Sequence, residues 1–163
     1  MEELSMRKAR SVYRKLTEAI AENGWKYKAD DDKLIMVYGI KSEEKEEPVN
    51  FIVKVDAERQ LILLETRPII TFNADVLISA AEAVCTANVI LADGCFDLKL
   101  KSCELIYRQA LSFRSSTNLS VGAIKYLLSY SVFAVNSFLG KLKLVNDGKI
   151  SGAEFTDACK DIM

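Results

Sequence analysis

The clearest local pattern in the sequence is a strand period interrupted by a tight turn. Residues 96–100 alternate between apolar and polar side chains, and residues 104–108 alternate again after the Lys101-Ser102 pair. Alternation with a period of two on both sides of a short turn is typical of a β-hairpin. Apolar runs of strand length also occur upstream, at 25–29, 34–40, 51–55 and 61–64. The sequence therefore predicts an antiparallel sheet of about six strands.

Helical segments surround these strands. They lie at 3–23, 74–91, 120–144 and 151–162, and the charged run at 41–48 is expected to be a loop. The predicted order is α-β-β-β-β-α-β-β-α-α, and strands joined by hairpins favour an α+β fold in which helices flank an antiparallel sheet. No repeat or linker divides the 163 residues, so we expect a single domain over 1–163, with helix 151–162 as a C-terminal appendage.

The absence of histidine excludes several kinds of catalytic site. Ser-His-Asp catalysis, Cys-His catalysis and zinc sites with imidazole ligands all require that side chain. The 22 basic and 23 acidic residues give a net charge of −1, which argues against a nucleic-acid-binding surface. Because the chain also has no glycine-rich phosphate loop and no evident pair of catalytic carboxylates, we expect no enzymatic activity, no cofactor and no metal site.

The cysteine pattern and the N-terminus favour a cytoplasmic location. The sequence has no C-x-x-C pair among its four cysteines, Cys85, Cys95, Cys103 and Cys159. Small buried thiols in a reducing compartment are the simpler interpretation. No apolar signal-peptide segment follows Met1. Residues 121–139 have the length of a membrane span, but Lys125 and Asn136 lie inside that segment, which favours a buried helix of a protein that does not enter the membrane.

One C-terminal motif resembles half of a calcium-binding loop. The run from Asp147 to Glu154 matches the second half of an EF-hand, whereas Lys143 and Val145 occupy the positions where early oxygen ligands are needed. A glycine turn followed by Ser151 capping the last helix explains the same residues.

The long helix at 120–144 has two apolar faces. The second face consists of Tyr126, Tyr130 and Phe133, which share one side of a helix at spacings of four and three. A helix with two apolar faces has two neighbours. We therefore predict that these three aromatic residues contact a protein partner or a second copy of the chain, with coverage by other helices of the same chain as the alternative. The N-cap of this helix is expected to be Asn118 or Ser120.

Asn88 is a candidate buried polar residue. It falls at helical spacing among apolar residues, and an unpaired buried amide is unfavourable by about 1–3 kcal/mol. The favoured interpretation is an amide bonded to the backbone at the end of the helix, and the alternative is a ligand contact.

Three segments together resemble a known family. They are Asn88, the run Asp93-Gly94-Cys95-Phe96-Asp97-Leu98, and the run Glu104-Leu105-Ile106-Tyr107-Arg108. This arrangement is similar to the middle of YbjN-type bacterial domains, which share the fold of type III secretion chaperones. Gly24-Trp25, Asp32 and Val53-Lys54-Val55-Asp56 fit the upstream part of the same pattern, and the resemblance extends from about residue 5 to residue 140.

The resemblance implies a compact domain that dimerises and acts by binding other proteins. Secretion chaperones hold extended partner segments against apolar grooves and sheet edges, and YbjN-type domains have been called sensory-transduction regulators. We therefore predict a non-enzymatic, chaperone- or adaptor-like protein-binding domain that forms a homodimer. The alternatives are a small-ligand sensor, with Asn88 and the basic face of the first helix reading an anion, and a carboxylate-dependent enzyme.

Overall fold

The computed structural model describes residues 2–42, 44–114 and 119–162. Helices and strands follow one another in the order α1 (Glu2–Glu22), β1 (Tyr27–Asp30), β2 (Ile35–Ser42), β3 (Lys45–Asp56), β4 (Leu61–Thr66), β5 (Ile70–Thr71), the 3-10 turn η1 (Ala74–Val76), α2 (Leu77–Ile90), β6 (Cys95–Lys99), β7 (Glu104–Ser112), α3 (Val121–Asn146) and α4 (Gly152–Ala158). The expected α+β class is therefore confirmed.

The strands form one antiparallel sheet of seven strands in the order β1-β2-β3-β4-β7-β5, with β6 also paired to β7. In the sheet, β7 lies between β4 and β6. The hairpin β6–β7 therefore pairs with β4, although α2 separates the two in the sequence. Side chains alternate across the sheet, so Tyr38, Phe51 and Thr66 share its buried face.

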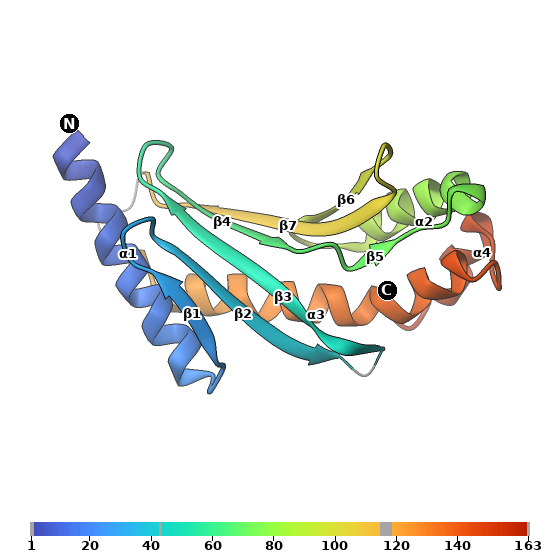
Figure 1. The fold of residues 1–163 in the computed structure, drawn as a ribbon, viewed down its shortest axis with the longest axis horizontal. Helices are drawn as coiled ribbons and strands as arrows, with labels where there is room; N and C mark the ends of the chain where they lie inside the picture. Colours follow the sequence, from blue (N-terminus) through green and yellow to red (C-terminus); the bar gives the residue numbers. More distant parts are fainter. Residues whose placement is uncertain (1, 43, 115–118, 163) are drawn as a thin grey trace.

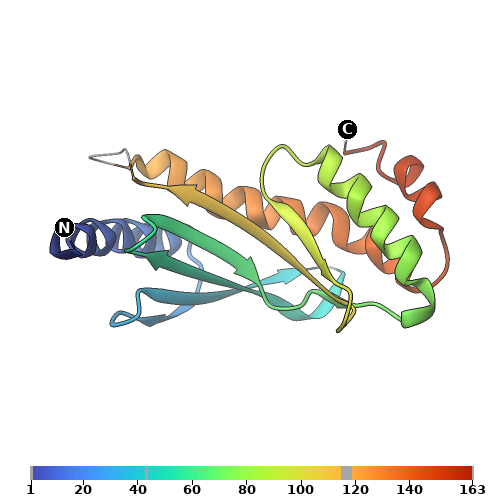
Figure 2. The same ribbon diagram turned by 90° about the horizontal axis from the view of Figure 1, so that it is seen from above.

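Helices cover one face of this sheet. Figure 1 shows α1 at one end of the molecule and α2 with α4 at the other end, and α3 runs between them along the sheet. Figure 2 shows α3 in its own layer beside the strands. Aromatic contacts join the layers. Phe138 of α3 meets Phe96 of β6 edge-to-face and stacks on Phe155 of α4, with ring centroids 5.7 and 6.4 Å apart. The core therefore runs the length of the molecule between the sheet and α3.

The sequence predicts a charged loop at 41–48, whereas the structure shows the ends of two paired strands there. β2 continues to Ser42 and β3 begins at Lys45, with a bulge between Ile40 and Ser42. The side chains of Glu46, Glu47 and Pro48 are exposed. Backbone hydrogen bonds pair the two strands here, and no side chains need to be buried. The segment therefore lacks the alternation of apolar and polar residues that is typical of a half-buried strand.

Smaller departures from the predicted boundaries have similar causes. The two-residue strand β5 was missed because it is too short to have a periodic signal, and β7 extends to Ser112, beyond the predicted hairpin. The last helix ends at Ala158 rather than at residue 162.

Both predicted helix caps are present in the described residues. Ser120 Oγ accepts a hydrogen bond from the backbone N–H of Ala123, and the alternative cap Asn118 lies outside the described residues. Ser151 and Glu154 form a reciprocal capping box at α4, so this carboxylate caps a helix as the glycine-turn interpretation predicts. No helix among the described residues is long and apolar enough to cross a membrane.

Candidate protein-binding surfaces

Tyr126, Tyr130 and Phe133 form an exposed aromatic patch on α3. The Tyr126 and Tyr130 rings stack with centroids 5.3 Å apart, and Phe133 lies 5.8 Å from Tyr130. These residues lie opposite the buried face of α3, which includes Ile124 and Leu128. Tyr126 and Phe133 remain 48% and 54% exposed, so the described helices of the same chain leave both rings accessible to solvent.

The middle ring of the aromatic patch is fixed to the turn between α2 and β6. The hydroxyl oxygen of Tyr130 accepts hydrogen bonds from the backbone N–H groups of Ala92 at 2.8 Å and Asp93 at 3.4 Å. This contact restricts the rotamer of Tyr130, and its neighbours stack against a ring that is already held in place.

A buried polar network holds the same turn against the sheet. Gln109 donates from Nε2 to Asp93 Oδ2 at 2.7 Å, and the hydroxyl of Tyr107 donates toward Gln109 Oε1 at 3.1 Å and the carbonyl oxygen of Asp93 at 3.2 Å. Burial raises the pKa of Tyr107 above its usual value, so its hydroxyl remains a neutral donor. Gly94 lies directly against this hydroxyl with φ +69°, a conformation that favours glycine.

Asn88 pairs with the backbone of β6. Its side-chain Nδ2 donates to the carbonyl oxygen of Phe96 at 3.0 Å, and its Oδ1 accepts from the Phe96 N–H at 2.7 Å. The amide therefore satisfies one residue of β6 in the way that a neighbouring strand would.

The outward face of α2 carries a second exposed apolar surface, which sequence reasoning missed. Ile78 and Val89 are 80% and 86% exposed, Cys85 lies between them, and Leu100 of the β6–β7 turn closes a shallow groove beside Ile78 and Cys85. The opposite face of α2 is buried through Ala80, Ala83, Val84 and Ala87. We call Ile78, Cys85, Val89 and Leu100 the α2 stripe. The signal available in the sequence was a helix that is apolar nearly all round.

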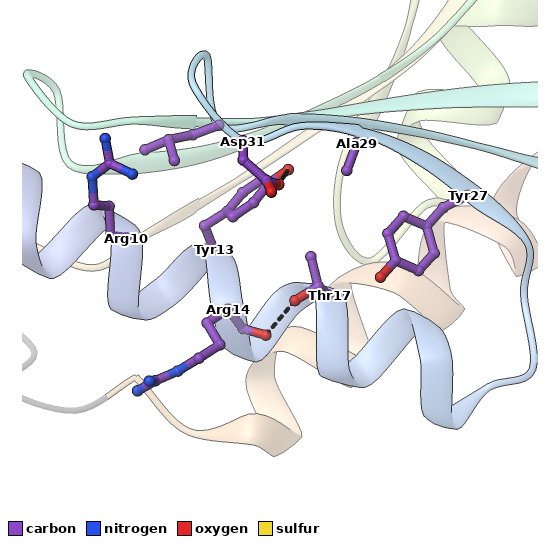
Figure 3. A pocket seen from close by; sticks show the side chains of 8 residues that line it. Arg10, Tyr13, Arg14, Thr17, Tyr27, Ala29 and Asp31 are labelled. Carbon is purple, nitrogen blue, oxygen red and sulfur yellow. Dashed lines mark hydrogen bonds between the residues drawn. The ribbon is translucent and has the colours of Figure 1, made fainter.

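A third surface lies between α1 and β1. Arg10, Tyr13, Arg14, Thr17, Tyr27, Ala29, Asp31 and Leu34 line a pocket of about 400 Å³ (Figure 3). At its centre the Tyr13 hydroxyl donates to Asp31 Oδ1 at 3.0 Å and lies 3.2 Å from the carbonyl oxygen of Ile35. Burial, together with the hydrogen bond to Asp31, raises the pKa of Tyr13 to about 12. The tyrosine therefore stays neutral and holds this carboxylate in place.

The structure separates residues that the sensor hypothesis combines. Asn88 lies on α2, whereas the basic face of α1 lies at the other end of the molecule (Figure 1). The carboxylates are likewise dispersed, because the described residues contain no group of three His, Cys, Asp or Glu side chains able to hold a metal ion.

Comparison with known proteins shows the fold and leaves the family open. No protein-family model matches the sequence. A search of curated proteins also finds no match. A similar solved structure is a chain in the "Crystal Structure of the ExsC-ExsE Complex", which is 15% identical with a TM-score of 0.52. The alignment covers 79% of this chain and 91% of that chain. At 15% identity this likeness shows a shared fold, which the resemblance in the sequence predicts to be like that of type III secretion chaperones.

Proposed function

We propose that this chain is a non-catalytic, chaperone-like domain that binds an extended segment of another protein. The observation that carries the proposal is the aromatic patch, in which two rings are about half exposed on an otherwise well-packed helix. Aromatic side chains are enriched in protein interfaces because they bury a large area with few rotatable bonds. Since Tyr130 is already bonded to the α2–β6 turn, binding a partner requires little ordering of the aromatic patch.

The similar solved chain supports this proposal because it belongs to a complex of two proteins, ExsC and ExsE. We further propose that the chain is a bacterial, cytoplasmic protein related to YbjN-type domains, and that it acts in signalling or secretion as an adaptor.

The test uses the full chain and random peptides of about 12 residues, which span about 40 Å when extended. We expect the wild-type chain to enrich a family of peptides. Replacing Tyr126 and Phe133 with alanine should weaken the best peptide by about tenfold or more, since aromatic contact residues at interfaces contribute about 2 kcal/mol or more. The matched control replaces Leu4 and Val121, which are also exposed, with alanine. Equal binding by the aromatic double variant, or no enrichment by the wild type, contradicts the proposal.

The proposed homodimer is supported by the α2 stripe. Small side chains, Ala81 and Cys85, lie near the centre of the outward face of α2, with Ile78 and Val89 toward its ends. Two antiparallel copies of such a helix place the large residues of one copy against those of the other, and the small central residues allow close approach.

Analytical ultracentrifugation at tens of micromolar tests the dimer. We expect the wild type and Leu4→Glu to sediment as dimers and Val89→Glu to sediment as a monomer, because a buried unpaired carboxylate opposes association. A variant that retains Cys85 and carries serine at Cys95 and Cys103 should also form a disulfide-linked dimer on mild oxidation. A wild-type monomer, or a Val89→Glu dimer, contradicts this assignment.

A further inference from the structure

The carboxylate of Asp93 lies in the turn beside the aromatic patch and has no compensating positive charge. Its two oxygens accept hydrogen bonds from neutral donors, the Gly94 N–H at Oδ1 and the Gln109 side-chain amide at Oδ2, both at 2.7 Å. No lysine or arginine in the described parts of the chain forms an ion pair with it. Neutral donors satisfy the lone pairs of a carboxylate but leave its net charge in place.

This charge is close to the aromatic rings. The backbone N–H of Asp93 lies 3.4 Å from the hydroxyl oxygen of Tyr130, and Tyr126 stacks on the Tyr130 ring. Figure 2 shows the connection between α2 and β6, which includes Asp93, passing beside the middle of α3. Partial burial, and after it the charge of Asp93, raises the pKa of Tyr126. The field of the carboxylate therefore reaches the exposed end of the aromatic patch.

Positive side chains on the neighbouring segments are already neutralised. Lys125 of α3 bonds to Glu22 at 2.7 Å, and Arg108 of β7 bonds to Asp97 at 2.7 Å. These two ion pairs cancel, so the charge of Asp93 gives this part of the surface its sign.

The exposed ring faces have the same electrostatic preference. An aromatic face carries the negative end of the ring quadrupole and attracts a cation that lies within about 6 Å of the ring centroid. Because Tyr126 and Phe133 are about half exposed, ring surface is accessible on both sides of Tyr130. Covering the surface with an apolar side chain would bury the charge of Asp93 further without a counter-charge, which is unfavourable. A positively charged side chain would compensate that charge.

We infer that the partner segment places an arginine or lysine side chain against the exposed rings of Tyr126 and Phe133, next to the charge of Asp93. This inference rests on the proposed function and specifies the chemistry of the partner. Arginine fits best, because its planar guanidinium stacks on an aromatic face while its edge continues to donate hydrogen bonds to water. Asp93 acts through its nearby charge, since its oxygens are already bonded to Gly94 and Gln109.

The experiment enriches random peptides of about 12 residues on the full wild-type chain and measures the best of them on Asp93→Asn. Wild-type peptides should share Arg or Lys at one position relative to their apolar residues. Asp93→Asn should bind the best peptide about threefold or more weakly, and its affinity should fall less steeply with rising salt concentration. Asparagine keeps the shape of the side chain, and rotation of the Gln109 amide by a half-turn restores the hydrogen bond between the two side chains.

Asp75→Asn is the matched control. Asp75 is exposed, forms no ion pair among the described residues, and is separated from Asp93 by the length of α2, which is about 20 Å. The control makes the same change in net charge and should keep the wild-type affinity and salt dependence.

Two substitutions of Tyr126 separate the ring face from apolar area. Tyr126→Phe keeps the ring and should bind the best peptide within about twofold of the wild type, whereas Tyr126→Leu keeps an apolar side chain without a ring and should bind it about threefold or more weakly. Norleucine in place of the basic residue of the peptide should remove the difference between Tyr126→Phe and Tyr126→Leu. If Asp93→Asn does not fold, as judged by circular dichroism, this comparison decides the inference.

The outcomes separate this inference from the proposed function. Wild-type peptides without a shared basic position overturn the inference, as does a folded Asp93→Asn with wild-type affinity and salt dependence. If such peptides still lose affinity when Tyr126 and Phe133 are replaced with alanine, the proposed function stands and this inference fails. If the wild type enriches no peptide, both fail.

Discussion

Replacing Gly94 with alanine tests the packing that supports the aromatic patch. A Cβ at this position would lie 2.1 Å from the Tyr107 hydroxyl oxygen and 3.0 Å from the Arg108 carbonyl oxygen, and the backbone has φ +69°. The left-handed conformation costs an alanine about 1–2 kcal/mol. Displacing the Tyr107 hydroxyl removes a hydrogen bond of about 1 kcal/mol and leaves buried acceptors unpaired, at about 1–3 kcal/mol. We expect the free energy of unfolding to fall by about 3–6 kcal/mol, a large part of the stability of a typical domain.

Gly24 provides the matched control because it has φ +71° and no atom within 4 Å of an added Cβ. Gly24→Ala therefore has only the backbone penalty, partly offset by the lower entropy of the unfolded chain, and should cost about 1 kcal/mol. Urea unfolding followed by circular dichroism measures both variants. If Gly94→Ala is no less stable than Gly24→Ala, the contact between this turn and Tyr107 does not stabilise the fold as argued.

Three further substitutions test other contacts. Asn88→Ala should lower the free energy of unfolding by about 2 kcal/mol, because it leaves one donor and one acceptor of β6 unpaired; unchanged stability in urea would show that water replaces the amide without loss. Tyr130→Phe keeps the ring and removes the acceptor for the Ala92 N–H, so amide exchange measured by NMR should accelerate at that residue and the aromatic patch should lose affinity for peptides. Hydrogen bonds from Ser151 hold the pKa of Glu154 below its ordinary value of 4.5. Since unfolding raises this pKa, the stabilisation is present above about pH 4.5 and is lost as the pH falls through the lower pKa of the folded state. Glu154→Ala should therefore be less stable than the wild type at pH 7 and should approach the stability of the wild type near pH 3. A stability difference that is the same at both pH values would contradict the capping role.

Local periodicity predicted most helices and strands because each pattern depends on neighbouring residues. Residues 96–108 alternate as a hairpin, and the helix at 120–144 is observed as Val121–Asn146. The insertion of β7 between β4 and β6 depends on contacts between residues far apart in the sequence, such as Leu63 with Ala110, and no local pattern specifies them. Strand segments with two exposed faces, as at Glu46 and Glu47, likewise resemble loops in composition.

The candidate surfaces show the same division between local and non-local information. Helical spacing places Tyr126, Tyr130 and Phe133 on one face, but their exposure depends on where α2 and α4 pack. The composition of α2 is apolar on nearly every side, and only the tertiary structure shows that Val89 is exposed. Likewise, Arg10 resembles an ordinary solvated charge until β1 is placed beside α1.

The proposed dimer surface and the proposed partner surface lie on different helices, and this separation makes a further prediction. The α2 stripe is on the outward face of α2, whereas the aromatic patch is on α3. We expect Val89→Glu to abolish dimerisation while preserving the peptide dissociation constant within about twofold. We expect the replacement of Tyr126 and Phe133 with alanine to weaken the peptide and leave sedimentation unchanged. Calorimetry and ultracentrifugation on the same samples measure the two properties. Loss of peptide affinity in Val89→Glu would mean that the partner surface extends across the dimer.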